Sequence, residues 1–381
     1  MAPKKDGGLR IAMLGHKRIP SREGGVEIVV TELATRMAAS GHSVSCYNRK
    51  GHHVSGEEFD SERLTEYKGV RIKSVFTVRK GGLAAASSSF FAALKAAFGI
   101  YDAVHFHAEG PCAMIWLPKF FGKRCVATVH GLDHQRAKWG RFASWYIRFG
   151  EKCAVRFADE IIVLSENVRE YFLKTYNRQT VFIPNGVSAV EKKRADEIIS
   201  RFGLAEGEYI LYLGRLVPEK GVMRLIEAFK KASPEKKLVI AGGSSDTDEY
   251  EKELKAAAKD CPDIVFTGFV QGRLLEELFS NAYFYVLPSD VEGMPLSLLE
   301  AMSYGNCCLV SDIPECTSVI GDCGVVFDRD KTDDLKNQLQ MLCKNPDIVR
   351  SYASKSAEYV CNKYNWDDVV YQTVELYRKR K

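Results

Sequence analysis

Short apolar and β-branched runs alternate with amphipathic segments along almost the whole chain, and this alternation restricts the fold more than any other feature. Runs such as LRIAMLG and AVHFH have the length and composition of strands, whereas VMRLIEAFKKAS repeats its apolar residues at helical spacing. Strands that are apolar throughout are typical of parallel sheets covered by helices on both faces. The predicted strands are residues 9–15, 42–48, 70–76, 103–107, 124–130, 160–165, 181–186, 209–215, 237–243, 264–269, 282–289, 306–312 and 324–328.

The alternation restarts after residue 187, at the segment VSAVEKKRADEIISRFG, which is polar and is predicted to be helical. A chain of 381 residues is also long for a single core. We therefore predict two doubly wound domains, residues 1–187 and 188–360, with a cleft between them. Residues 361–381 are predicted to form a helix, and its return to the first domain is left open. Ligands of such sheets bind beyond the carboxyl ends of the strands.

Composition and charge narrow the class of protein. The eleven cysteines are scattered and lack a CxxC motif, which favours reduced thiols in a cytoplasmic chain. The sequence shows no signal-type segment and no apolar run of about 18 residues, so we expect a soluble or peripheral protein. Residues 1–185 carry a net charge of +11 and residues 186–381 a net charge of −6, which indicates different partners for the two halves.

The motif EGMPLSLLE follows the predicted strand 282–289. Pro295 suits the first turn of a helix and Gly305 suits its end, so we predict a helix from Pro295 to Tyr304. Glu292 then lies in the preceding loop. An acidic residue before a helix is explained by the helix dipole alone, but Glu300 is the single charge of an apolar stretch and needs another explanation.

Backbone N–H groups near Leu296 and Ser297 would suit a phosphate, because they lie at the start of this helix. A second loop, GRLVPEKG, follows the strand 209–215 and carries Arg215 and Lys220. Two cations and two glycines at a strand end match a diphosphate clamp, with Arg binding bidentately and Lys as a point charge. The alternative is that both are ordinary solvated residues.

Together these motifs resemble the retaining nucleotide-sugar glycosyltransferases of family four (glycosyl transferases group 1). The resemblance rests on SREGGVE, TVHG, VLSE, IPNGV, GRLVPEKG and EGMPLSLLE, and covers nearly the whole chain. It implies the GT-B fold, in which two Rossmann-like domains face each other. HKRIPSREGGVE and HFHAEGP further resemble a bacterial rhamnosyltransferase-like subgroup of surface-polysaccharide synthesis.

The resemblance also implies roles for individual residues. Glu300 would bind the ribose hydroxyls, and Glu292 would bind hydroxyls of the donor sugar. His130 would lie beside the anomeric carbon, and Phe269 beside the base. The implied catalytic group is His130, Arg215, Lys220 and Glu292. The implied donor-binding group is Gly24, Gly25, Phe269, Gly293, Met294, Leu296, Ser297 and Glu300. The acceptor-binding group is His16, Lys17, Arg18, Arg22, His107, Glu109 and Asp133.

The implied activity is transfer of a hexosyl or deoxyhexosyl unit from a nucleotide-diphosphate sugar to a glycan or lipid-linked acceptor, with retention of configuration. No cofactor, catalytic metal or nucleic acid is expected. DTD at 246–248 is better explained as a helix start capped by Asp246 or Thr247. A zinc site built from the strand-end histidines, including His105 and His134, is disfavoured. A glycosidase would leave the phosphate-type loops unexplained, and a dinucleotide site would need the missing G-x-G-x-x-G. A sugar-nucleotide epimerase of the same architecture remains the alternative.

The segment QRAKWGRFASWYIRFGEKCAVR (135–156) carries six basic residues, one acid and five aromatics. Such a helix can lie in the interface of an anionic membrane, with aromatics on one stripe and basic residues on the next. It can equally be a covering helix that buries its aromatics against the sheet. Both interpretations stay open. The apolar stripe is Phe142, Trp145, Phe149 and Cys153, and the basic stripe is Arg141, Arg148, Lys152 and Arg156.

Overall fold

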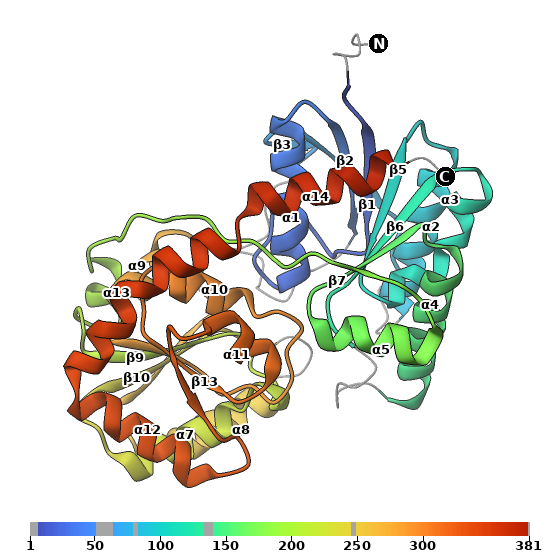
Figure 1. Cartoon of the computed structure of the whole chain (residues 1–381). Coiled ribbons are helices and arrows are strands. Elements are labelled where there is room, and N and C mark those ends of the chain that lie inside the picture. Colours follow the sequence, from blue (N-terminus) through green and yellow to red (C-terminus); the bar gives the residue numbers. More distant parts are fainter. Residues whose placement is uncertain (1–6, 51–63, 79–82, 133–139, 245–248, 380–381) are drawn as a thin grey trace. The chain divides into compact units, whose positions relative to one another are not determined.

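The computed structural model describes residues 7–50, 64–78, 83–132, 140–244 and 249–379 (Figure 1). The chain divides into two compact units. The first comprises Met1–Asn185 together with Trp366–Lys381, and the second comprises Gly186–Asn365. The predicted helix caps Asp246 and Thr247, and the predicted acceptor residue Asp133, lie outside the described residues.

The first unit is built on an eight-stranded sheet of order β3-β4-β2-β1-β5-β6-β7-β8. All its pairings are parallel except that of β3 with β4, and β3 is a short edge strand that the sequence did not predict. The strands are β1 Arg10–Leu14, β2 Ser43–Arg49, β3 Glu66–Tyr67, β4 Val70–Val75, β5 Ala103–His107, β6 Arg124–Val129, β7 Glu160–Val163 and β8 Val181–Phe182. The helices are α1 Gly25–Ala39, α2 Leu83–Phe98, η2 Gly110–Met114, α3 Trp116–Phe120, α4 Arg141–Phe157, α5 Glu166–Tyr176 and α14 Trp366–Arg378.

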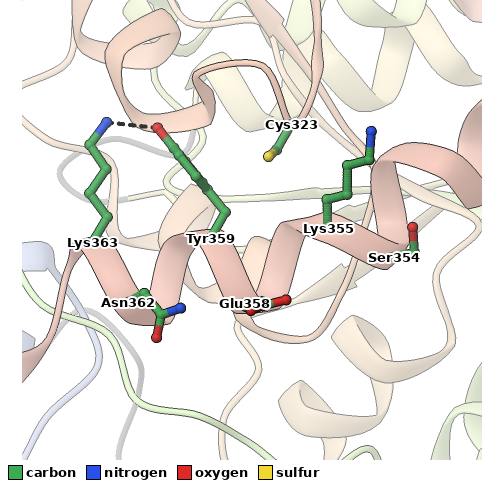
Figure 2. Close-up of a pocket in the computed structure, with 7 residues that line it drawn as sticks. All are labelled: Cys323, Ser354, Lys355, Glu358, Tyr359, Asn362 and Lys363. Carbon is green, nitrogen blue, oxygen red and sulfur yellow. Dashed lines mark hydrogen bonds between the residues drawn. The ribbon is translucent and has the colours of Figure 1, made fainter.

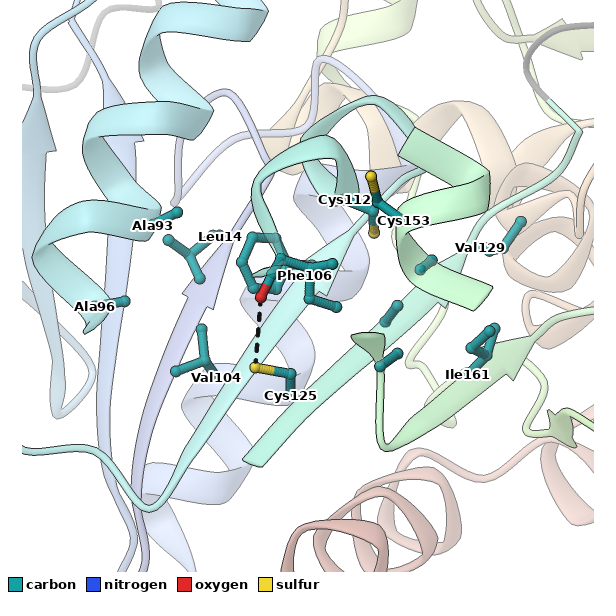
Figure 3. Close-up of a cluster of buried hydrophobic side chains, with 14 of the residues drawn as sticks. Leu14, Ala93, Ala96, Val104, Phe106, Cys112, Cys125, Val129, Cys153 and Ile161 are labelled. Atoms are coloured by element: carbon teal, nitrogen blue, oxygen red, sulfur yellow. Dashed lines mark hydrogen bonds between the residues drawn. The ribbon is translucent and has the colours of Figure 1, made fainter. Parts of the chain in front are cut away.

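One face of this sheet is covered by α2, η2 and α4, where the core cluster of Figure 3 lies. Strand β5 shows the alternation. Val104 and Phe106 enter this cluster, while His105 points to the other face and contacts Tyr377 of α14. Small residues of α2, such as Ala93 and Ala96, pack directly onto the sheet. None of the eleven cysteines, which all lie within the described residues, forms a disulfide.

Helix α14 is the last element of the chain and belongs to the first unit, where it packs against α1 and β6. Arg124 Nε donates a hydrogen bond of 2.6 Å to the carbonyl of Leu376. Arg36 and Asp367 form an ion pair of 2.8 Å between α1 and α14. The C-terminal helix thus completes the helical cover of the first sheet.

The second unit is built on a six-stranded parallel sheet of order β11-β10-β9-β12-β13-β14. Two parallel α/β units confirm the predicted fold class. The strands are β9 Tyr209–Leu213, β10 Lys237–Ala241, β11 Ile264–Gly268, β12 Phe284–Leu287, β13 Cys308–Ser311 and β14 Val325–Phe327. The helices are α6 Glu197–Phe202, η4 Pro218–Lys220, α7 Val222–Ala232, α8 Glu249–Ala258, α9 Gly272–Asn281, α10 Leu296–Ser303, α11 Pro314–Ile320, α12 Thr332–Lys344 and α13 Pro346–Lys363.

The prediction of a helix over residues 187–203 is wrong for most of that segment, because only α6 is helical. Side chains of α9 satisfy the backbone groups that a helix would have satisfied. Ser280 Oγ accepts from the Lys193 N–H, and buried Glu277 accepts from the N–H groups of Asp196 and Ile198. Tertiary hydrogen bonds therefore override the local propensity of a polar segment.

Candidate functional site

The two predicted loops of the second unit meet at the carboxyl edge of its sheet, because β9 and β12 are neighbours. Lys220, at the end of η4, places its Nζ 2.5 Å from Oε1 of Glu292. Ser289 Oγ donates to the same carboxylate oxygen at 2.7 Å. The two charged side chains are only 15% and 8% exposed, so the pair is shielded from water. A shielded pair interacts more strongly than a surface ion pair.

Arg215 follows β9 and is half-buried. Among the described residues its guanidinium has no ion-pair or hydrogen-bond partner, so its donors are available to a ligand. The loop turns tightly after Lys220. Gly221 has a φ of 66°, and a side chain there would lie 2.0 Å from the carbonyl oxygen of Pro288. Only glycine lets this loop approach the end of β12 so closely.

Helix α10 runs from Leu296 to Ser303, one residue shorter at each end than the predicted helix Pro295–Tyr304. Pro295, predicted in the first turn, is the cap residue, and Gly305 lies just beyond the end as predicted. No side chain caps this helix within the described part of the second unit, so its first N–H groups are open to an anion. Ser297 is held by Tyr285, whose hydroxyl lies 2.9 Å from its Oγ. Gly293 and Met294 are buried, whereas Glu300, one turn into the helix, and Phe269, just after β11, are half-buried.

In the first unit, three predicted histidines lie along neighbouring strand ends. His16 follows β1, His107 ends β5 and His130 follows β6, and these strands are adjacent in the sheet. His107 Nδ1 lies 3.2 Å from His130 Nε2. Behind them, His105 contacts Thr128 Oγ1 at 2.7 Å through Nε2 and the Tyr377 hydroxyl at 2.6 Å through Nδ1.

Burial keeps His16, His105 and His107 uncharged. It lowers the pKa of His16 to about 4 and that of His105 to about 3. The pKa of His107 falls well below its usual value, first through burial and then through the neighbouring histidines His105, His130 and His16. Near neutral pH, His16, His105 and His107 are therefore neutral rings that each offer one donor and one acceptor nitrogen.

The loop between β1 and α1 carries Lys17, Arg18 and Arg22, which are all half-buried. Gly24, the last residue of this loop, is the cap residue of α1, and Gly25 is the first residue of that helix. The Oε1 of Glu27 accepts from the Lys17 N–H at 2.8 Å, and a side chain at Gly24 would lie 2.6 Å from Oε2. A side chain at position 24 would therefore displace the Glu27 carboxylate from its place beside the loop. The predicted acceptor residue Glu109 is fully buried.

Several residues that position the site were missed from the sequence. Ser289 fixes Glu292, and Tyr377 fixes His105 from 272 positions away. Arg49, whose N–H donates to the carbonyl of Lys17 next to His16, belongs to no recognised motif, and neither does Tyr146 of α4. Strand ends could have drawn attention to Arg49, but only the strand order places it beside His16.

The remaining pockets and side-chain clusters of the described residues give no second candidate site. A shallow pocket on α13 is lined by Cys323 and by α13 side chains such as Lys355 and Tyr359, and by none of the predicted residues (Figure 2). Within the described ranges, no group of three or more His, Cys, Asp or Glu side chains could hold a metal ion. None of the helices in those ranges has both the length and the apolar composition of a membrane span.

The structure has two α/β units with mainly parallel sheets, and loops suited to ligand binding follow the carboxyl ends of the strands. These features define a protein of the GT-B class. A family model for "Glycosyl transferases group 1" matches residues 195–359, and one for "Glycosyltransferase Family 4" matches residues 23–191. The chain therefore belongs to the group 1, family 4 glycosyltransferases, and it is an enzyme of that kind.

Relatives with known names agree with this assignment. The chain is 26% identical over 290 residues to α-maltose-1-phosphate synthase of Mycolicibacterium smegmatis, covering 68% of this chain and 74% of that protein. It is 26% identical over 268 residues to GDP-mannose:cellobiosyl-diphosphopolyprenol α-mannosyltransferase of Xanthomonas oryzae pv. oryzae, covering 67% and 68%. Among solved structures, Anabaena Alr3699/HepE in complex with UDP and glucose shares the fold, with a TM-score of 0.80, 18% identity and coverage of 96% and 98%.

Proposed function

We propose that this glycosyltransferase moves a hexosyl or deoxyhexosyl unit from a nucleotide-diphosphate sugar to a glycan or lipid-linked acceptor, with retention and without a metal ion. The observation that carries the proposal is the edge of the second sheet. There Arg215, whose guanidinium has no partner among the described residues, lies with the shielded Lys220–Glu292 pair and with the start of α10, which no side chain of those residues caps. The similarity to proteins named as GDP-mannose- and UDP-binding supports a nucleotide-sugar donor.

The chemistry of the reaction explains this choice of groups. The difficult steps are to stabilise an oxocarbenium-like centre and the negative charge on the departing diphosphate. Arg215, Lys220 and the N–H groups of α10 are preorganised positive groups that can stabilise that charge electrostatically. In the proposed front-face mechanism, a phosphate oxygen of the leaving group takes the acceptor proton, and no enzyme nucleophile is needed. Glu292 would then bind hydroxyls of the donor sugar.

The proposal is tested first by a thermal-shift panel of UDP, GDP, ADP and dTDP with their sugars, because a bound ligand raises the melting temperature. With the preferred donor, added acceptor should speed release of the nucleotide diphosphate, and NMR should show a product with the donor's anomeric configuration. Full activity in EDTA is expected. An inverted product would contradict retention. A changed sugar on an intact nucleotide would favour the epimerase, which finds no support in the family matches.

We expect Glu300→Gln to weaken binding of the nucleotide itself, since a carboxylate binds two ribose hydroxyls better than an amide does. The loss should be about tenfold and equal for free nucleotide and nucleotide sugar, as measured by calorimetry. Glu227→Gln, at an exposed position on α7, is the matched control. Unchanged binding together with a collapsed rate would assign Glu300 a chemical role instead.

The acceptor is proposed to be glycan or lipid-linked, in polysaccharide assembly at the inner face of a bacterial membrane. The diphosphopolyprenol acceptor in the name of the Xanthomonas relative supports this class. The rhamnosyltransferase-like motifs HKRIPSREGGVE and HFHAEGP keep a deoxyhexose among the expected sugars.

Helix α4 supports a membrane contact. Three of its aromatics are not buried against the sheet, because Phe142, Trp145 and Phe149 are 76%, 60% and 43% exposed. They stack in a row, with ring centroids 5.9 and 6.0 Å apart. Of the predicted apolar stripe only Cys153 is buried. The exposed face also carries Arg141, Arg148, Lys152 and Arg156, and no acid. An exposed aromatic and basic helix face suits an anionic lipid interface.

We expect the full-length protein to co-sediment with anionic vesicles at low salt, and not with neutral ones. Reversal of Arg141 and Arg148 to Glu should weaken this binding at least about 30-fold, since each basic residue contributes about 1 kcal/mol. The control reverses Arg169 and Lys174 on α5, which are exposed in the same unit. Equal binding of both double variants, or none by the unmodified protein, would leave α4 as an ordinary surface helix.

A further inference from the structure

A row of polar side chains lies along the carboxyl edge of the first sheet, beyond the histidines already described. Strands β2, β1, β5 and β6 are neighbours in this order. Their ends carry Arg49, His16, His107 and His130, respectively. Tyr146 of α4 has a buried hydroxyl, and the charge of Arg49 opposes the burial that raises the pKa of this tyrosine. Arg49 lies beside the loop of His16, because its N–H donates a hydrogen bond of 2.7 Å to the Lys17 carbonyl.

Four atoms of this row are buried and have no hydrogen-bond partner among the described residues: Arg49 Nε, His16 Nδ1, His107 Nε2 and the Tyr146 hydroxyl. Buried polar atoms are almost always hydrogen-bonded, and leaving one unsatisfied is costly. Four such atoms on neighbouring elements therefore indicate that something polar completes them. The choice is between ordered water and a ligand.

The proton positions of His16 follow from its partner. The Asn48 amide binds both backbone groups of Ile19, with Nδ2 donating to the carbonyl at 2.9 Å and Oδ1 accepting from the N–H at 3.1 Å. Its oxygen therefore faces His16, and His16 Nε2 must be the donor in their 3.1 Å contact. The unpartnered Nδ1 of neutral His16 is thus a hydrogen-bond acceptor.

Arg49 is positively charged, and no carboxylate among the described residues forms an ion pair with it. Its guanidinium makes one long hydrogen bond, from Nη2 to the Gly15 carbonyl at 3.4 Å. Burial lowers its pKa, which Glu27 partly opposes from a greater distance. A shielded guanidinium with free donors is suited to a phosphate oxygen, which arginine binds through several N–H groups. Lys17, Arg18 and Arg22 add positive charge in the adjoining loop.

We propose that Arg49 and Tyr146 bind an anionic oxygen of a phosphate or diphosphate group on the acceptor, and that His16 accepts a hydrogen bond from a neighbouring hydroxyl. The inference rests on the proposed function, since it concerns the acceptor of that reaction. It deepens that function by naming an acidic acceptor and two residues that recognise it. Water, sugar hydroxyls and the anion would together satisfy atoms that the chain leaves unpaired.

The test is calorimetry on the full-length protein with inorganic phosphate, inorganic pyrophosphate and geranyl diphosphate. All variants carry Lys220→Ala, which weakens the expected diphosphate site of the second unit. Arg49→Met should weaken pyrophosphate binding about 10- to 100-fold, as expected for a lost charge-assisted hydrogen bond. Tyr146→Phe, which preserves packing, should weaken it several-fold. Arg71→Met removes an exposed arginine of β4 and should change nothing.

The outcomes separate the possible ligands. Geranyl diphosphate binding more tightly than pyrophosphate would identify a lipid-linked acceptor, and equal affinity a soluble phosphorylated glycan. The proposal is overturned if Arg49→Met and Tyr146→Phe bind pyrophosphate as Arg71→Met does, which would mean that ordered water satisfies the row. The nucleotide panel is independent. If no nucleotide binds the unmodified protein, the proposed function fails, whatever the result at Arg49.

Discussion

Lys220→Ala is expected to lower the turnover of sugar transfer by about 10²- to 10³-fold while the protein stays folded. The physical reason is the loss of one preorganised positive charge at the departing diphosphate. In the structure this charge is 2.5 Å from Glu292 and is shielded from water, so no mobile counterion replaces it easily. The measurement is steady-state kinetics with the donor that the nucleotide panel selects.

The chain offers a closely matched control for this experiment. Lys230 of α7 also forms a 2.5 Å ion pair, with Asp260, but that carboxylate is 73% exposed. Lys230→Ala removes the same group and an ion pair of the same length from the same unit, and it should leave turnover unchanged. If a well-folded Lys220→Ala protein has near-normal kinetics, Lys220 does not neutralise the leaving group.

Short sequence patterns predicted those parts of the site that are formed by one continuous stretch of the chain. The α10 prediction succeeded because Pro295 and Gly305 mark the two helix ends by their own backbone preferences. Strand runs such as 282–289 were predicted for the same kind of reason, since a fully buried parallel strand is apolar on both faces. The binding role of the loops after β9 and β12 was predicted because ligands of such sheets bind beyond the carboxyl ends of the strands.

Contacts between residues far apart in the sequence could not be predicted from local patterns. Arg49 reaches His16 only because β2 pairs with β1, and Tyr377 reaches His105 only because the last helix belongs to the first unit. Residues 187–196 have a polar composition that favoured a helix, but contacts with α9 decided otherwise. The face that α4 presents to solvent was likewise undecided until the exposure of its aromatics was known.

The second large effect is expected at His130, which the proposed mechanism places beside the anomeric carbon. His130 follows β6 and is oriented by its 3.2 Å contact with His107, whose charge is suppressed by burial. His130→Ala should preserve donor binding, because the diphosphate and ribose groups are expected to bind to the second unit. Transfer should fall at least about 10²-fold, as for other preorganised groups at a reacting centre. The lost hydrogen bond to His107 should cost about 1 kcal/mol of stability.

Donor affinity, transfer rate and melting temperature must all be measured for this variant, since a structural histidine would change only the last. His42→Ala is the control. His42 Nδ1 accepts a 3.0 Å hydrogen bond from the Leu9 N–H at the amino ends of β1 and β2, far along the strands from the histidine row. Its substitution should lower stability without slowing transfer. If His130→Ala behaves in the same way, the histidine row is part of the core, and the reacting centre must be sought at other residues of the first unit.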